Sequence, residues 1–106
     1  MSCVSSLTTI GIGSSFAVWF RGAADEDGNY INDGTCTWYL EDDDGDTIAT
    51  GDMEYVTSSN GNYRGVIAGS ITDGLENLGF YFVKSVFDGG TDEDAVRRLS
   101  CQAKYQ

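Results

Sequence analysis

The sequence contains no histidine and no proline, and only six of its 106 residues are lysine or arginine. Without histidine, the chain lacks the commonest general base and the commonest metal-binding side chain of proteins. Its serines and cysteines therefore lack their usual activating partner, and we expect no catalytic residues and no enzymatic activity. The glycine-rich stretch "GIGSSF", residues 11–16, lacks the third glycine of a dinucleotide-binding turn, so we expect no cofactor.

Positive charge is scarce throughout the chain. Lysine occurs only at Lys84 and Lys104, against seventeen acidic residues, and the formal net charge is -11. A field of this sign repels the phosphates of nucleic acids and the headgroups of anionic membranes. We therefore expect neither nucleic acid nor membrane as a partner.

Long apolar runs are also missing. No stretch approaches the roughly 20 apolar residues that a membrane-spanning helix needs. Residues 1–20 carry no charged side chain, but they lack the basic start and the unbroken apolar centre of a signal peptide, so we expect no export by a cleaved signal.

Cysteine is present in an odd number. Cys3, Cys36 and Cys101 are widely spaced, which is typical of neither a disulfide framework nor a zinc site. We expect buried free thiols, and a Cys36–Cys101 bridge is the alternative if the two strands adjoin.

Short strand-like runs fill most of the sequence. Clusters of Gly, Asp and Asn separate them about every ten residues, which is the spacing typical of a β-sandwich. We predict a single domain over residues 1–106 with an all-β fold: an immunoglobulin-like Greek-key β-sandwich of about seven antiparallel strands. The one helix candidate, residues 91–100, has too few apolar positions and is interpreted as a loop entering a strand. The expected strands are 4–12, 15–21, 34–41, 47–56, 62–68, 79–87 and 96–105.

The central hairpin permits a prediction of register. If Asp44 and Gly45 form a two-residue type I′ turn, Trp38 lies opposite Gly51, and its ring covers the glycine. The same register places Cys36 opposite Met53. A bulged turn is the alternative, and it would turn Ile48 toward the core.

Two acidic stretches resemble each other: "DEDGNYI", residues 25–31, and "DDDGDTI", residues 42–48. Aligned on an EF-hand loop by their glycines, both lack the carboxylates of the first and twelfth positions, so we predict solvated turns and no metal site. A loose calcium site formed by Asp42, Asp44 and Asp46 is the alternative. We expect the two stretches to share turn residues but not geometry, the first opening a longer passage between sheets.

Aromatic residues occupy both faces of two predicted strands, "FAVWF" (16–20) and "GFYFV" (79–83). A two-layer sandwich that stands alone would alternate apolar and polar residues. If Tyr81 faces the core, then Phe80 and Phe82 face outward, as does one face of the first strand. We predict a protein-binding interface at Trp19, Phe80 and Phe82, and burial of these side chains under loops is the alternative.

Tyr81 also follows Leu78 and Gly79 at the entry to its strand. This arrangement resembles the tyrosine corner of Greek-key sandwiches, in which the tyrosine hydroxyl binds the backbone of the preceding loop.

Three stretches together carry a wider resemblance. "GTCTWYLEDDDGDTIATGDMEYV" (34–56), "GNYRGVI" (61–67) and "LGFYFVKSV" (78–86) follow one another in an order that is similar to small immunoglobulin-like β-sandwich proteins from the structural gene clusters of tailed phages. The resemblance covers about residues 15–105, and bacterial surface modules share the same order of strands.

The resemblance implies a component of the virion, assembled in the host cytoplasm. The expected function is capsid decoration or cementing, with the major capsid protein or other virion proteins as partners and a homo-oligomer as a further arrangement. One alternative is a tail, baseplate or fibre adaptor. Another is a carbohydrate- or receptor-binding module that stacks its ligand on Trp19, Tyr30 or Tyr39.

Overall fold

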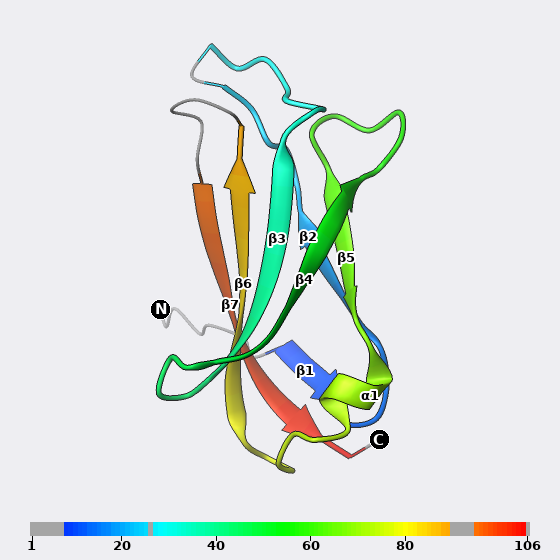
Figure 1. The fold of residues 1–106 in the computed structure, drawn as a ribbon, viewed down its shortest axis with the longest axis vertical. Coiled ribbons are helices and arrows are strands. Elements are labelled where there is room, and N and C mark those ends of the chain that lie inside the picture. The colour runs from blue at the N-terminus through cyan, green and yellow to red at the C-terminus, as the bar shows by residue number, and fades with distance from the viewer. Residues whose placement is uncertain (1–7, 26, 90–94, 106) are drawn as a thin grey trace, which may run out of the picture.

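A computed structural model describes residues 8–25, 27–89 and 95–105, and it shows an all-β fold with one short helix (Figure 1). Short runs rich in β-branched and aromatic residues form the strands, and clusters of Gly, Asp and Asn separate them. The elements are β1 (Thr8–Gly11), β2 (Phe16–Phe20), β3 (Thr35–Asp42), β4 (Thr47–Tyr55), β5 (Tyr63–Ile67), α1 (Gly69–Thr72), β6 (Phe80–Asp88) and β7 (Ala95–Lys104).

The seven predicted strands are confirmed in order, with ends within a residue or two wherever the structure describes them. Residues 4–7 of the first predicted strand and residues 91–94 of the helix candidate lie outside the described residues. The prediction of antiparallel strands alone was wrong, because β1 pairs with β7 in parallel. The helix α1 was not predicted, since it depends on a distant contact: the Thr72 hydroxyl donates to the Ser14 carbonyl at 2.7 Å.

The strands form one sheet in the order β1-β7-β6-β3-β4-β5-β2. The sheet curls back on itself through β4, which pairs with β3 along most of its length and with β5 at its end. This brings the inner face of β2 over β6, where Phe20 stacks on Phe87 with ring centroids 5.3 Å apart. Tyr63 of β5 meets the same Phe87 ring at 5.2 Å. Within the part of the chain that the structure describes, no helix is long and apolar enough to span a membrane.

The β3–β4 register is the predicted one, although the turn is not. Trp38 lies opposite Gly51 and Cys36 opposite Met53. The type I′ turn was wrong: the Gly45 amide donates to the Asp42 carbonyl at 3.0 Å, and only Gly45 of the central turn residues has positive φ. The turn is therefore one residue longer, and an irregularity after Leu40 restores the register. Ile48 is the bulged residue, because Leu40 pairs with Ala49 and Glu41 with Thr47. Its side chain points to solvent and is 47% exposed.

The Trp38 ring lies over two glycines of neighbouring strands. A Cβ atom at Gly51 would lie 2.7 Å from the indole, and one at Gly65 would lie 2.7 Å from the indole and 2.8 Å from Met53 Cγ. Both Trp38 and Met53 are buried. The predicted packing of the ring on Gly51 is thus confirmed, and Gly65 completes it.

Two tyrosine hydroxyls fix loops to the sheet. Tyr81 Oη accepts a hydrogen bond from the Glu76 amide at 2.9 Å, which confirms the predicted attachment of Tyr81 to the preceding loop. Tyr63 Oη donates to the Ile31 carbonyl at 2.8 Å and accepts from the Gly34 amide at 3.0 Å. The two Tyr63 bonds hold the connection from β2 to β3 against the core.

Candidate functional site

The three predicted interface residues lie on outer strand faces, as their alternation indicated. Trp19 of β2 is 38% exposed and Phe80 of β6 is 51% exposed. Phe82, two residues along β6, is only partly exposed, and the Arg98 guanidinium lies 5.6 Å from its ring centroid. Trp19 and Phe80 are accessible to another protein, whereas Phe82 is already partly covered.

These residues do not form one surface. The inner faces of β2 and β6 pack on each other through Phe20 and Phe87. Their outer faces therefore point to opposite sides of the domain, with Trp19 on one side and Phe80 and Phe82 on the other. A single docking surface that unites all three predicted residues does not exist in this fold.

An ion cluster around the buried Glu41 places Arg98 beside the Phe82 ring. Glu41 is only 3% exposed, and its carboxylate lies 3.3 Å from Lys84 Nζ and 3.0 Å from Arg98 Nη2. The residues come from β3, β6 and β7, which adjoin in the sheet, and the ladder places Tyr39, Lys84 and Arg98 in one row. This cluster secures the outer face of the three strands, so we assign it a structural role.

A groove opens between β2 and β7, where the curled sheet does not close. It encloses about 470 Å³, a volume typical of ligand pockets, and its lining is mostly apolar. Its walls are the edge of β2, Thr8 at the start of β1, and the part of β7 before Cys101, where the described residues of β1 do not pair. The floor is β6. Its principal lining residues are Phe16, Val18, Trp19, Val83, Arg97 and Leu99.

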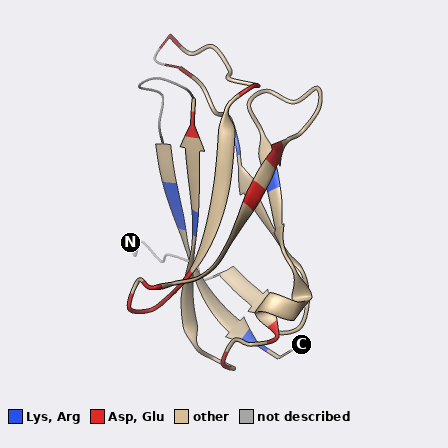
Figure 2. Ribbon diagram, viewed as in Figure 1, with Lys and Arg blue, Asp and Glu red and all other residues tan. Residues whose placement is uncertain are grey.

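Arginine side chains surround this groove. Arg21 lies 4.2 Å and Arg64 lies 5.8 Å from the Trp19 ring centroid, measured from the guanidinium carbon. Arg97 lies 4.0 Å from the Phe20 ring and donates to the Arg21 carbonyl at 2.7 Å. Figure 2 shows basic residues in β5, β6 and β7 and just past the end of β2, while acidic residues occupy the loops, β4 and the ends of β3 and β6.

Sequence reasoning missed this basic groove. The residues that form it are far apart in the chain, and only the curl of the sheet brings β2 next to β7. The one available signal was the concentration of scarce positive charge in "RRL", residues 97–99, of a chain with six basic residues.

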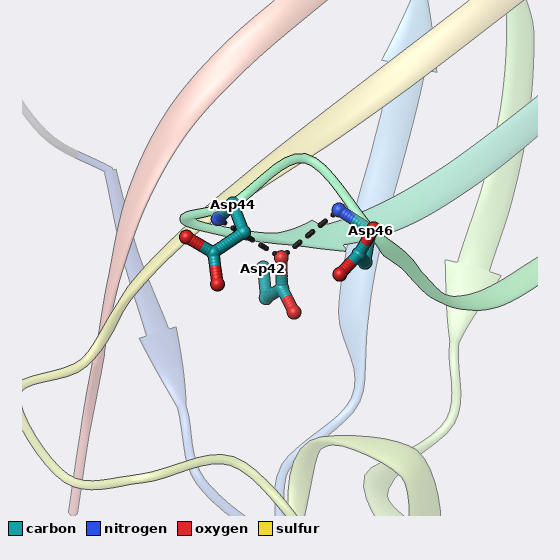
Figure 3. A group of neighbouring side chains, drawn as sticks. All are labelled: Asp42, Asp44 and Asp46. Carbon is teal, nitrogen blue, oxygen red and sulfur yellow. Dashed lines mark hydrogen bonds between the residues drawn. The ribbon is translucent and has the colours of Figure 1, made fainter.

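The two acidic stretches have the same geometry, so the expectation of different geometries was wrong. Asp42 Oδ1 accepts hydrogen bonds from the amides of Asp44 at 3.0 Å and Asp46 at 2.9 Å (Figure 3). In the other stretch Asp25 Oδ1 accepts from residues 27 and 29 at the same two distances. Each stretch is a compact turn, because the first aspartate binds the backbone two and four residues on.

The first acidic turn also closes a short β-bridge. Ala24 pairs with Tyr30 in antiparallel orientation, and the passage to β3 begins only after this bridge. The similarity of the two stretches in sequence therefore reports a repeated turn.

Among the residues that the structure describes, Asp42, Asp44 and Asp46 form the group that could hold a cation. Their carboxylate oxygens lie within 4.8 Å of one another, and oxygen ligands suit calcium. The two backbone bonds to Asp42 Oδ1 already account for its orientation without a metal (Figure 3). The cluster by itself therefore assigns no metal site.

The described cysteines, Cys36 and Cys101, are free and buried. A bridge between them is excluded, because β6 separates their strands and they lie in different rows of the sheet. Cys3 lies outside the described residues. Burial raises the pKa of each thiol to about 11, so both resist becoming the thiolate that nucleophilic chemistry requires.

These thiols predict a loss of stability at high pH. Their folded pKa of about 11 exceeds 9.0, the usual pKa of a thiol. Between these values the unfolded chain releases protons that the folded chain retains, so the free energy of unfolding falls as pH rises. The linkage amounts to on the order of 2 kcal/mol for each thiol. Urea titrations from about pH 8 to pH 11 measure the fall.

The matched comparison is a variant with Cys36→Ala and Cys101→Ala. It will be less stable at neutral pH because it loses packing, but its stability will depend less steeply on pH in the same window. An equally steep decline in both proteins would show that other groups cause it.

Comparison with known proteins adds no relative: no family model matches the chain, and neither a curated protein nor a solved structure shows significant similarity. The functional argument therefore depends on the geometry above.

Proposed function

We propose that this chain is a non-enzymatic structural or accessory protein of a tailed-virus particle, which decorates or cements the capsid by binding neighbouring subunits. The observation that carries the docking function is the exposure of large apolar side chains on regular strands. Trp19, Phe80 and Val96 are 38%, 51% and 61% exposed, although strands usually turn such residues inward. The virion setting rests on the sequence resemblance alone.

An immunoglobulin-like Greek-key topology is part of this proposal. Three features support it: the parallel pairing of the first and last strands, the pairing of β2 with β5, and the position of β3 between β4 and β6. The Tyr81 hydroxyl bound to the loop backbone is a fourth.

Exposed apolar residues on opposite sides suit a protein that bridges neighbours. One side presents Trp19 beside the groove. The other presents Phe80, which shares a hollow of about 340 Å³ with Ile48 and with Asp42. Two separate contact surfaces would let one copy touch two subunits of a shell, which is the requirement for a cementing protein.

Two of the three rings of the carbohydrate-binding alternative, Trp19 and Tyr39, do not favour it, while Tyr30 is 53% exposed. Lys84 Nζ lies 4.8 Å from the Tyr39 ring, and Arg21 lies 4.2 Å from the Trp19 ring. A sugar-stacking platform needs an open ring face, and a basic side chain is already placed over each of these rings.

Two measurements test the proposal. Quantitative mass spectrometry of purified virus particles should find the chain in hundreds of copies; a handful of copies would indicate a tail adaptor, and absence from particles would refute the proposal. In reconstitution on particles that lack the chain, Phe80→Ser should weaken attachment about tenfold or more. The control Tyr30→Ser alters an equally exposed ring, 53%, outside the strand faces, and should attach normally.

A further inference from the structure

The groove between β2 and β7 has an unusual combination of properties for this chain. It is lined by apolar side chains, bordered by strand edges and surrounded by arginines, whereas the protein as a whole carries a net charge of -11. Each property restricts what can occupy it.

The edge of β2 restricts the shape of the occupant. Among the described residues, β2 pairs with β5 alone, in register from Phe16 opposite Ile67 to Phe20 opposite Tyr63. Alternate residues of such an edge strand present backbone N–H and C=O groups to the open side. An extended peptide can satisfy these groups as an added strand, which is a common mode of peptide recognition.

The lining restricts the side chains of that strand. Successive residues of a strand point to opposite faces, so one set would enter the groove above Val83 and Leu99, both of which line it. These positions require apolar residues. The other set would continue the outer face of β2 beside Trp19, within reach of Arg21.

The charge restricts the partner further. Arg64 lies opposite Glu54 across the β4–β5 ladder, so Arg21 and Arg97, which lie beside the end of β2, are the cations that we assign to a newcomer's carboxylates. The Debye length is about 8 Å at physiological ionic strength, so a bound segment responds mainly to the charges nearest to it. Carboxylates on the newcomer would complement it.

We propose that the β2–β7 groove binds an extended acidic segment of a partner protein, in which apolar and acidic residues alternate, by strand addition to the edge of β2. This inference names the partner chemistry for the docking function proposed above and rests on it.

A synthetic peptide tests the inference. The probe alternates glutamate with valine over about seven residues, enough to span β2, and is blocked at both ends. Calorimetry and amide chemical shifts of the folded chain should show saturable binding that perturbs residues 16–20 and weakens as salt is raised. A peptide with lysine in place of glutamate should not bind. Two further peptides carry N-methyl groups on alternate residues, one on the odd positions and one on the even positions. Methylation removes the backbone donors that pair with β2, so at least one of these two peptides should not bind.

Matched charge reversals locate the site on the protein. Arg21→Glu should weaken binding about tenfold or more, while Lys104→Glu, the same change away from the groove, should leave it unchanged. The melting temperatures of both variants confirm that they fold. Binding that tolerates Arg21→Glu, equal binding of the lysine peptide, no binding at millimolar peptide, or a dimer of the free chain joined through β2 would each overturn the inference. A chain that is present in virus particles yet fails to bind the peptide would refute this inference alone, whereas absence from particles would refute the docking function in the virion.

Discussion

Replacing Gly65 with alanine will lower the free energy of unfolding by about 2 kcal/mol, and replacing it with valine will lower it by more. The added Cβ atom would lie 2.7 Å from Trp38 Cδ1 and 2.8 Å from Met53 Cγ, closer than packed carbons approach. Neither neighbour can move into solvent, because Trp38 is 3% and Met53 is 6% exposed. Backbone entropy alone would favour alanine over glycine in a regular strand, so the expected loss of stability comes from the steric contact.

Urea unfolding of three proteins checks this prediction. Gly74→Ala is the matched control, because its nearest neighbour would be the Ile71 carbonyl at 3.6 Å, and its stability should stay within about 0.5 kcal/mol of the parent. Adding Trp38→Phe to Gly65→Ala should recover part of the loss, since the smaller ring makes room. A Gly65→Ala protein as stable as the parent would show that the ring does not pack on this glycine.

Removing both cations from the ion cluster is the second change with a large expected effect. In a Lys84→Met, Arg98→Met protein, the Glu41 carboxylate, whose side chain is 5% exposed in the parent, would lose both of its present partners. An unpaired buried charge costs about 3 to 5 kcal/mol, so this protein should be severely destabilised at neutral pH.

A third substitution distinguishes the charge from the packing. Adding Glu41→Met removes the buried carboxylate, and the resulting apolar trio should recover most of the lost stability, because well-packed apolar residues often replace a buried ion pair at little cost. Denaturant titrations of the parent, the double variant and the triple variant measure both steps. If the triple variant is no more stable than the double, lost packing rather than an unpaired charge causes the damage.

Local patterns in the sequence were sufficient to predict most of the fold. Strand alternation places Trp38 on the inner face and Phe80 on the outer face, and each is found there. The turn after β3 shows the limit of this reasoning. The predicted register holds although the turn type is wrong, because a longer turn and the bulge at Ile48 shift the strands in opposite directions. The inner-face packing of Trp38 over Gly51 and Gly65 is consistent with the observed register.

The candidate site could be predicted only in part. Trp19 was identified because both faces of its strand are apolar, a signal that lies within five consecutive residues. Arg97 and Leu99 were not identified, since their role depends on how the whole sheet curls. The parallel pairing of β1 with β7 was missed for the same reason, because no local sequence pattern indicates that the first strand lies beside the last one.

The most direct test of the account is hydrogen–deuterium exchange of the chain, free in solution and attached to its particle. An edge strand that gains a partner strand acquires new hydrogen bonds, and its amides then exchange more slowly. We predict that attachment slows exchange in residues 16–20 of β2 and in Arg97 to Leu99 of β7, while the acidic turn that begins at Asp25 exchanges as before. Equal exchange of β2 in the free and attached states would contradict docking through this groove.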